Sequence, residues 1–448
     1  MKRLFGTDGV RGVVGEGLDA NLAFALGVSA AEVLSHGEGP LTVLVGEDTR
    51  ESSPMLAAAL AAGLAAGGAV VRMLGVLPTP AVSYLTTLYR ADVGAVVSAS
   101  HNPHEYNGIK LFGADGEKLS DLYEEAIEAA LSHTSEHAAR CGRVIPEAGA
   151  QEAYLAHLAA IAPPPHELRV ALDCANGAFS PIGAQVLSLL SKNGRLLFCE
   201  PDGRNINRGC GSMALSALSE VVRTGGFDLG VAFDGDGDRC LLLDECGRVV
   251  DGDEILAITA LDRHRRGILG SFAVVGTVMS NGGLARLLAD EGIGFSAAAV
   301  GDRYVREEMR RCGCTLGGEA SGHIIFSEHA PTGDGAITAL EVLSVMLRRC
   351  EPLSALAARM KRYPARTVNL PMPMSARSAV EGDPEIASAR YAAEQMLAGE
   401  GRLVLRPSGT EPYLRITVEA RDAYLLDAVC DALVKKVAHS LEKYNSCK

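Results

Sequence analysis

The sequence has no tryptophan and few aromatic residues, and it also lacks any long apolar segment. Its first residues, MKRLFGTDGVRG, start with two basic side chains, but a glycine and an aspartate follow almost at once, so the apolar region of a secretory signal does not form. The longest uncharged run, residues 52–71, is rich in alanine and glycine and divides into a helix, a Gly-Gly turn and the start of a strand. We therefore predict a cytoplasmic protein without a transmembrane segment or a membrane partner.

Positive charge is scarce as well. The 42 lysine and arginine residues face 55 aspartate and glutamate residues, which gives a formal net charge of −13. This balance argues against a broad surface for a polyanion, so no nucleic acid partner is expected. A small phosphorylated substrate stays compatible, because a few local cations and a metal ion bind it whatever the global charge.

Cysteine clusters of the zinc type are missing. Eleven cysteines, an odd number, are scattered through apolar segments, which is typical of reduced and buried thiols. Cys312 and Cys314 form the only tight pair, and no second cysteine or histidine pair stands at zinc spacing. The sequence therefore favours free thiols over a zinc site.

What the sequence does contain is a repeated alternation of strand-like apolar runs and helical patterns. In the first region, runs at 41–46, 69–74 and 93–100 are separated by a helix after Ser53-Pro54 and by another from about Ala81. Such a β-α-β-α-β series predicts a mostly parallel sheet covered by helices. The pattern then restarts twice, with candidate strands at 167–173, 195–200, 227–234, 272–278, 295–301 and 315–326.

After Tyr363-Pro364 the pattern changes to fewer and less hydrophobic strand candidates, a helix near 378–398 and a terminal helix. We predict an α/β protein with three consecutive related α/β domains that hold mixed sheets, followed by a smaller C-terminal α+β domain. The predicted domains are residues 1–155, 156–251, 252–364 and 365–448.

The stretch SASHNPHEYNGIK, Ser98 to Lys110, follows a buried strand, where open α/β sheets place their ligands. Ser100 is a candidate nucleophile and phosphate carrier, with His101 and Lys110 as cationic or proton-transferring neighbours. A polar loop with an ordinary serine is the alternative.

DGDGDR, Asp234 to Arg239, also follows a buried strand. Asp234, Asp236 and Asp238 alternate with glycine, so their carboxylates can converge on a hard cation, and such clustered charge repels itself unless a metal or an arginine compensates. A calcium-binding EF-hand fits the spacing through Glu245. It conflicts with Arg239 at the required glycine position and with strand-like flanks.

In GGEASGHIIF, residues 317–326, the side chains of Glu319, Ser321 and His323 alternate, so on an extended segment they share one face. A carboxylate and a hydroxyl there suit the vicinal hydroxyls of a sugar, and His323 could transfer protons. A glycine-rich turn with a buried histidine is the alternative.

RPSGTEPYLRI, residues 406–416, offers hydroxyl and backbone N–H donors at Ser408, Gly409 and Thr410. Arg406 and Arg415 flank this turn and can form bidentate bonds to phosphate, unless they are surface arginines of a hairpin.

Two N-terminal arginines look like supports of a phosphate site. FGTDGVRG places Arg11 in a glycine-rich turn, and GEDTRESS places Arg50 just after a strand. Surface salt bridging is the alternative for both.

Taken together and in this order, SASHNP, DGDGDR, GEASGH and RPSGTEP resemble the four signature loops of the α-D-phosphohexomutase superfamily. Further stretches, DCANGA, PDGRNIN, GTVMSN, VGDRYV and TGDGAI, resemble its bacterial branch that acts on glucosamine phosphates. Ala320, where this branch usually has glutamine, and Glu47, where a basic residue is common, depart from that pattern.

The resemblance implies four domains around a central cleft and a reaction that moves a phosphoryl group between two hydroxyls of one sugar. Ser100 would be a phosphoserine, and one Mg²⁺ would be held by the three aspartates and a phosphoryl oxygen on Ser100. A sugar 1,6-bisphosphate would be the intermediate and primer, and the product would feed UDP-N-acetylglucosamine synthesis. The enzyme would be a monomer or a homodimer.

The resemblance also implies roles for the remaining side chains. Lys110, with His101 or His323, would move the hydroxyl proton, and Arg11 would add positive charge. Glu319 and Ser321 would read the sugar, and the turn with Arg406 and Arg415 would hold the phosphate that is not reacting. The alternatives are the same chemistry on glucose or mannose phosphates, a metal-dependent phosphatase, and a metabolite sensor.

Overall fold

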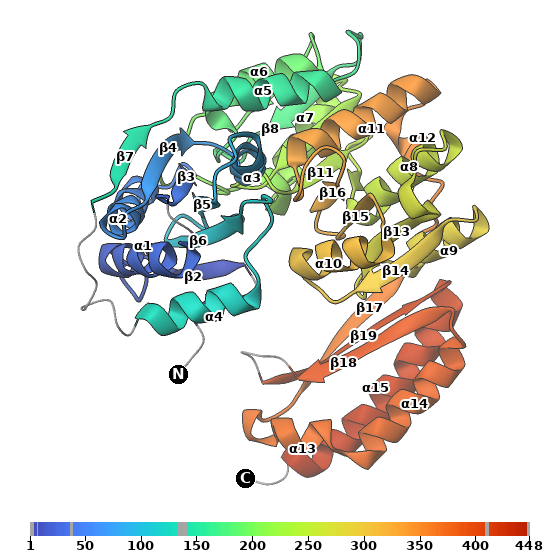
Figure 1. Cartoon of the computed structure of the whole chain (residues 1–448). Coiled ribbons are helices and arrows are strands. Elements are labelled where there is room, and N and C mark those ends of the chain that lie inside the picture. Colours follow the sequence, from blue (N-terminus) through green and yellow to red (C-terminus); the bar gives the residue numbers. More distant parts are fainter. Residues whose placement is uncertain (1–3, 7, 36–38, 132–140, 408–411, 446–448) are drawn as a thin grey trace. The chain divides into compact units, whose positions relative to one another are not determined.

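The computed structural model describes residues 4–6, 8–35, 39–131, 141–407 and 412–445 (Figure 1). The chain separates into two compact units, one of Met1–Met279 with Ile293–Ala358 and one of Ser280–Gly292 with Arg359–Lys448. Among the described residues, three sheets lie in the first unit and one in the second. One sheet falls in each predicted domain, although helix α5 (Ala150–Ile161) runs across position 155, and the domain boundaries stay a prediction.

The first sheet has seven strands in the order β1-β2-β6-β5-β3-β4-β7. Its strands are β1 (Phe5–Gly6), β2 (Gly9–Val13), β3 (Thr42–Glu47), β4 (Val70–Val76), β5 (Val93–Val97), β6 (Tyr106–Gly113) and β7 (Arg143–Pro146). Its helices are α1 (Ala20–Leu34), α2 (Ser53–Ala66), α3 (Thr79–Leu88), α4 (Asp121–Ala130) and α5 (Ala150–Ile161). Strands β5, β3, β4 and β7 are parallel, and β1, β2 and β6 add an antiparallel edge, so the sheet is mixed as predicted.

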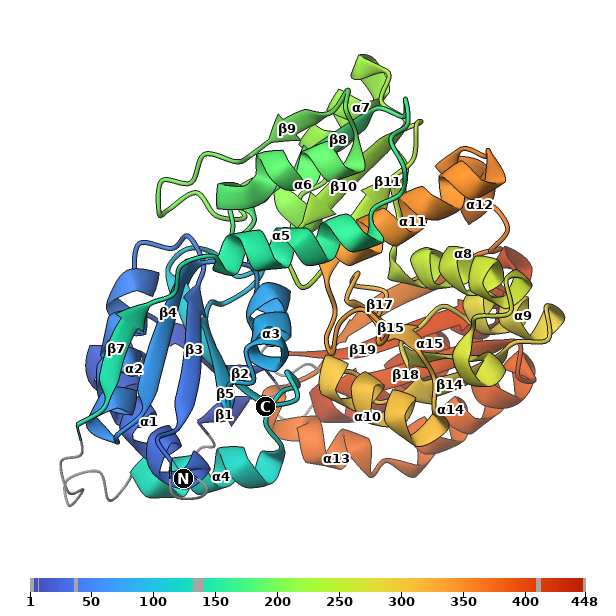
Figure 2. The same ribbon diagram turned by 45° about the horizontal axis from the view of Figure 1, so that its top comes forward.

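Both faces of this sheet are covered, which explains why its central strands are apolar throughout (Figure 2). Val43 and Val45 of β3 belong to the core that includes α1 and α2. On the other face, α3 packs so closely that a Cβ added at Gly46 would lie 2.5 Å from Val82 Cγ2. The loops that follow β3 and β5 at their carboxyl ends carry Arg50 and Ser100.

The second sheet has the order β12-β11-β10-β8-β9. Its elements are β8 (Val170–Asp173), β9 (Arg195–Leu197), β10 (Leu229–Phe233), β11 (Cys240–Leu243), β12 (Val249–Val250), α6 (Gly183–Leu190) and α7 (Ser216–Gly225). The antiparallel pair β11 and β12 forms one edge of this sheet.

The third sheet has the order β14-β13-β15-β16. Its elements are β13 (Ala273–Thr277), β14 (Gly294–Ala298), β15 (Leu316–Gly318), β16 (Ile324–Phe326), α8 (Gly252–Arg265), α10 (Asp302–Cys312), α11 (Gly335–Arg349) and α12 (Leu353–Ala357). Residues 315–326 do not form one extended segment, so that expectation is wrong. Gly318 pairs antiparallel with Ile324, and the Glu319 N–H donates to the His323 carbonyl at 3.0 Å, which closes a turn over 319–323.

The second unit has an antiparallel sheet in the order β17-β19-β18. Its elements are β17 (Ala365–Pro371), β18 (Gly401–Pro407), β19 (Tyr413–Ala420), α9 (Gly282–Asp290), α13 (Arg377–Glu381), α14 (Pro384–Leu397) and α15 (Ala423–Asn445). The helix predicted near 378–398 is divided in two. Asp383 caps the second part by accepting from the backbone N–H of Glu385 and Ile386, and Pro384 occupies its first turn.

None of the helices in the described part of the chain has the length and the apolar character that a membrane crossing requires. Its ten cysteines are free thiols, as predicted, but not all are buried, because Cys141, Cys246 and Cys350 are exposed.

Candidate active site

Ser100 lies at the centre of the site, in the loop after β5. Its backbone is left-handed, with φ of 52°, and its side chain is buried. The Ser100 Oγ donates to Asp234 Oδ2 at 2.5 Å, and His101 Nδ1 lies 3.4 Å from the same Oγ. The loops after β5 and β10 therefore bring the predicted phosphate carrier and the predicted metal loop into contact.

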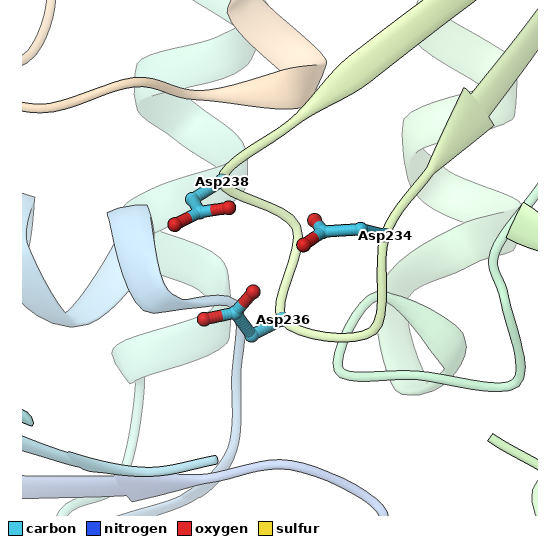
Figure 3. Close-up of side chains that lie close together, drawn as sticks. All are labelled: Asp234, Asp236 and Asp238. Carbon is cyan, nitrogen blue, oxygen red and sulfur yellow. The ribbon is translucent and has the colours of Figure 1, made fainter. Parts of the chain in front are cut away.

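The three aspartates of the metal loop converge as expected (Figure 3). Asp234, Asp236 and Asp238 are buried, and each offers one carboxylate oxygen within 4.8 Å of the others. Asp236 Oδ1 and Asp238 Oδ1 are buried without a hydrogen-bond partner. Burial, then the charges of Asp238 and Asp236, raise the pKa of Asp234 well above its ordinary value. A cluster of unsatisfied carboxylate oxygens fits a hard divalent cation.

The EF-hand alternative is excluded by the surroundings of this loop. The loop connects strands β10 and β11 rather than two helices. Glu245, which would supply the last calcium ligand, instead accepts from the side chain and backbone of Ser354.

Lys110 is buried in β6 and faces the same aspartates. Its Nζ donates to Asp236 Oδ2 at 2.8 Å and lies 3.3 Å from Asp8 Oδ2 and 3.7 Å from Asp238 Oδ2. Burial alone would lower the pKa of Lys110, but Asp236, Asp8 and Asp238 outweigh it and raise this pKa. Lys110 is therefore a fixed cation at neutral pH and suits proton donation better than proton abstraction.

The pKa values of the two histidines are shifted in opposite directions. Burial, then Arg239 and Arg11, lower the pKa of His101, so its imidazole is neutral beside Ser100. Burial also opposes the charged form of His323, but Asp238 and Asp302 outweigh it and raise the pKa of that ring. The Gly333 N–H donates to His323 Nε2 at 3.2 Å, so in the neutral ring Nδ1 carries the proton and faces Asp238.

The sugar loop borders a cavity of about 350 Å³ in the first unit, a volume within the usual range of small-molecule sites. Its lining includes Asp8, Lys118, Arg239, Asp302, Glu319 and Ser321, and His323 and Asp238 border it too. The turn, rather than an extended strand, is what brings Glu319, Ser321 and His323 to one cavity. Glu319 Oε1 accepts the Gly301 N–H at 3.1 Å, which fixes the carboxylate at the rim.

Arg11 has a different position from the one expected, and Arg50 lies just after strand β3 as expected but with other partners. Arg11 lies in strand β2, not in a turn, and pairs with Asp8 and with Asn102 Oδ1. Arg50 is buried, and its guanidinium donates to Asp48 and to four backbone carbonyls, so it is neither a surface ion pair nor a free cation for phosphate.

The fourth loop belongs to the second unit. Ser408, Gly409 and Thr410 lie outside the described residues. Arg406 of β18 stands directly opposite Arg415 of β19, and Arg415 Nε donates to Asn369 Oδ1 at 3.1 Å. Like charges placed opposite each other across a ladder are unfavourable unless an anion lies between them, which is consistent with the predicted phosphate turn.

Sequence reasoning missed an ion-pair chain at the cavity. Asp8 bridges Arg11, Lys110 and Lys118, and Lys118 Nζ lies 2.6 Å from Asp302 Oδ2 at the start of α10. Burial opposes the charge of Asp8, but these cations outweigh it and lower its pKa. Asp8 and Asp302 stand in FGTDGVRG and VGDRYV, so the signal was present, but nothing in the sequence paired residues so far apart.

Comparison with known proteins agrees with this geometry. Family models described as phosphoglucomutase/phosphomannomutase alpha/beta/alpha domains I, II and III match residues 2–138, 152–247 and 251–363, and the model of the C-terminal domain matches 368–436. The chain is 47% identical over 445 residues to a phosphoglucosamine mutase of Desulforudis audaxviator, covering 98% of each chain. It is 44% identical over 449 residues to a phosphoglucosamine mutase of Symbiobacterium thermophilum, covering 99% of this chain and all of the relative. The chain belongs to the phosphoglucomutase/phosphomannomutase family.

Solved structures of the phosphoglucomutase/phosphomannomutase family share the fold. A family protein from Burkholderia thailandensis superposes with a TM-score of 0.81 at 23% identity, covering 98% of both chains. The N-acetylphosphoglucosamine mutase of Aspergillus fumigatus, solved in complex with GlcNAc-6P and magnesium, gives a TM-score of 0.60 at 18% identity, covering 98% of this chain and 96% of the other. These likenesses confirm the predicted fold class, and the family models together with the relatives at 44–47% identity confirm the resemblance to the phosphohexomutase superfamily.

Proposed function

We propose that this enzyme interconverts glucosamine 6-phosphate and glucosamine 1-phosphate through a phosphoserine at Ser100 and a 1,6-bisphosphate intermediate. The observation that supports it most is the buried Ser100 Oγ, 2.5 Å from Asp234 in a cluster of aspartates with unsatisfied oxygens. The names of the relatives at 44–47% identity favour the amino sugar. The product would then supply UDP-N-acetylglucosamine synthesis, as the resemblance implies.

Phosphoryl transfer depends on in-line placement and on neutralising charge more than on covalent help from the protein. Asp234, Asp236 and Asp238 would hold Mg²⁺, which when bound acts as a Lewis acid on phosphoryl oxygens. Lys110 places a buried positive charge next to two of these carboxylates. The protein thus keeps a fixed cation beside the aspartates whether or not the sugar is bound.

Proton movement is divided between two side chains in this proposal. The neutral imidazole of His101, 3.4 Å from Ser100 Oγ, takes the serine proton when Ser100 is the attacking group. Lys110, charged and buried, donates a proton to the leaving sugar oxygen in the same step, and in the opposite direction the sugar hydroxyl proton passes to Lys110 while His101 returns its proton to the Ser100 oxygen. His323 carries its proton toward Asp238 and orients that carboxylate.

Sugar recognition would fall to the cavity. Glu319 and Ser321 would accept and donate hydrogen bonds at the sugar hydroxyls, and Arg11, Lys118 and Arg239 would provide positive charge for the reacting phosphate. Arg406, Ser408, Gly409, Thr410 and Arg415 would hold the other phosphate. A bisphosphate presents the same group at both ends, so one phosphate site serves both halves of the reaction.

The decisive experiment is kinetic. With Mg²⁺ and the matching bisphosphate primer, kcat/KM on glucosamine 6-phosphate should exceed that on glucose or mannose phosphates by about 10²-fold, which equals roughly 3 kcal/mol of discrimination. A preference for glucose or mannose would make the chain a phosphoglucomutase or phosphomannomutase, the alternative that Ala320 keeps open.

The phosphoserine is tested separately by intact mass. The purified enzyme should carry phosphate on Ser100, and Ser100→Ala should lose both this phosphate and mutase turnover. Ser188 is an exposed serine of α6. The control Ser188→Ala should retain both the phosphate on Ser100 and mutase turnover. Release of inorganic phosphate without mutase turnover would indicate a phosphatase instead.

A further inference from the structure

Two side chains from different sheets hold the same two carbonyl groups of the serine loop. Arg50 Nη2 donates to the carbonyl oxygens of Ser100 and Asn102 at 3.0 and 2.9 Å. Asn207 Nδ2 donates to the same two oxygens at 2.8 and 3.1 Å. Arg50 follows β3 of the first sheet, and Asn207 lies in PDGRNIN between β9 and β10 of the second, a stretch that the reaction has so far left without a role.

Arg50 and Asn207 together form a clamp on the serine loop. On the Arg50 side, every N–H donor of the guanidinium is used in a hydrogen bond. Its Nη1 donates to the carbonyls of Pro103 and Tyr106, and its Nε donates to Asp48 Oδ2 at 2.8 Å. A guanidinium has five N–H donors, and the observed contacts use all of them. Arg50 therefore fixes the whole course of the serine loop within the first sheet.

Asp48 also fixes the backbone N–H of Ser100, through the side chain of Ser98. Asp48 Oδ2 accepts from Ser98 Oγ at 2.7 Å, and that Oγ accepts the Ser100 N–H at 3.0 Å. The Ser100 peptide is thus held at its nitrogen from the first sheet and at its oxygen from both sheets.

The Asn207 side reaches the loop across a close backbone approach. A Cβ at Gly235, between two of the metal-loop aspartates, would lie 2.4 Å from the Ser100 oxygen and 2.8 Å from Asn207 Nδ2. Asn207 itself is left-handed, with φ of 60°, and its N–H donates to the Ala175 carbonyl at 2.9 Å. Asparagine tolerates that backbone better than most residues, and its side chain supplies the amide donors.

The clamp stabilises a backbone conformation of Ser100 that is unfavourable by itself. A non-glycine residue in the left-handed region costs free energy, and a surface loop would relax from it. Ser100 keeps φ of 52° because its carbonyl accepts two hydrogen bonds there, and this conformation directs Oγ to Asp234. A shift of about 1 Å in a reacting atom can cost 10²-fold in rate.

We infer that Asn207 is a positioning residue for phosphoryl transfer, which acts by holding the Ser100 carbonyl so that the serine Oγ faces the metal-loop aspartates. This inference rests on the proposed phosphoserine mechanism. Asn207 does not touch the predicted substrate cavity, so its effect should be on kcat and on the rate at which Ser100 accepts a phosphoryl group, not on KM.

The test uses Asn207→Asp in the full chain. Aspartate keeps the shape and tolerates the left-handed backbone, but it replaces the donor amide with a carboxylate facing two carbonyl oxygens. We expect kcat to fall about 10- to 100-fold with KM within about twofold of wild type. Phosphorylation of dephosphorylated enzyme by a sugar 1,6-bisphosphate, followed by intact mass, should slow by a similar factor.

Asn207→Gly is the second variant, because glycine accepts φ of 60° without strain and only deletes the donor; it should show a smaller loss of kcat in the same direction. Asn205→Ala is the matched control. Asn205 makes hydrogen bonds to Asp202 and Glu200 in the same loop and none to the serine loop, so kcat should stay at the wild-type value.

Wild-type kcat and phosphorylation rate in Asn207→Asp would overturn the inference and leave the proposed function standing. Equal losses in Asn207→Asp and Asn205→Ala, with a matching fall in thermal midpoint, would reduce Asn207 to a structural loop residue. If wild-type enzyme gave neither turnover nor phosphate on Ser100, the proposed function would fail and the inference with it.

Discussion

Asp234 Oδ2 accepts a hydrogen bond from Ser100 Oγ at 2.5 Å across 134 positions of sequence. The contact joins the end of β5 in the first sheet to the end of β10 in the second. It places the hydroxyl at the edge of a carboxylate cluster whose neighbouring oxygens, on Asp236 and Asp238, are unsatisfied. The behaviour of this cluster toward cations gives the first prediction.

Asp236→Asn should weaken magnesium-dependent turnover by about 10²-fold or more, because it removes a charge from the proposed ligand set. The amide can still accept from Thr79 Oγ1, which donates to Asp236 Oδ2 at 2.7 Å, so the fold should persist. Magnesium titration of activity, with calorimetric titration of the metal, measures the effect. Asp202→Asn, on an exposed aspartate, is the control, and an unchanged metal dependence in Asp236→Asn would reject the ligand assignment.

The raised pKa of the buried Asp334 predicts that the stability of the fold depends on pH. Burial raises its pKa from 3.8 to about 6, although hydrogen bonds from the backbone of Ile337 and Ala336 and from Tyr154 lower it. Because the folded chain holds this proton more tightly than the unfolded chain, the stabilisation is complete below about pH 3.8 and is lost as the pH rises to about 6. A shift of about two units corresponds to roughly 3 kcal/mol.

Asp334→Asn should remove this slope, because an amide does not titrate and can still accept the two N–H bonds that cap α11. The thermal midpoint of the variant relative to wild type should therefore increase between pH 4 and pH 7. Parallel midpoint curves for the two proteins would show that Asp334 does not carry a raised pKa.

Arg415→Ala should raise KM for the phosphosugar about tenfold or more while leaving the thermal midpoint near wild type, since a charge-assisted bond to phosphate would be lost. Asn369→Ala is the matched control, because it removes the hydrogen-bond partner of Arg415 but keeps the guanidinium. If both variants lost stability alike and kept the wild-type KM, Arg415 would be structural.

Helix α10 makes a row of ion pairs with residues 115–124. Arg306 Nε lies 2.9 Å from Glu117 Oε1, Arg310 Nη2 lies 2.6 Å from the same oxygen, and Arg303 Nη2 lies 2.8 Å from Glu124 Oε1. A double-mutant cycle with Arg306→Met and Glu117→Gln should give a coupling energy of about 0.5 to 1 kcal/mol, reduced at high salt. Strictly additive losses in chemical unfolding would show that the pair contributes nothing.

The sequence predicted best where periodicity and loop position decide the outcome. The alternation of apolar runs located the parallel strands β3, β4 and β5 of the first sheet, β8, β9 and β10 of the second, and β13 and β14 of the third, since buried parallel strands are apolar throughout. It did not locate β1, β2, β6 and β7. The placement of Ser100 and Asp234 after such strands predicted that both lie at carboxyl ends, where the structure has them in contact.

The sequence did not predict which side chains from distant segments would contact each other. Glu319, Ser321 and His323 come together through a turn, because Gly318 and Ile324 pair as a hairpin where an extended strand was expected. Arg50 was expected to add positive charge to a phosphate site, but it is buried between Asp48 and the serine loop and holds that loop. Local patterns carry no information about which segment will cover a side chain, so these positions depend on the tertiary fold.

The double hold on the Ser100 carbonyl has a consequence for the modularity of the chain. Arg50 and Asn207 both hold the serine loop, so its shape is not a property of residues 93–113 alone. A chimera that exchanges this segment between two relatives should keep its full turnover only if the segments that carry Arg50 and Asn207 come from the same parent. In recombination between such enzymes, the serine loop and its contacting residues in both sheets are therefore expected to be exchanged together as one block.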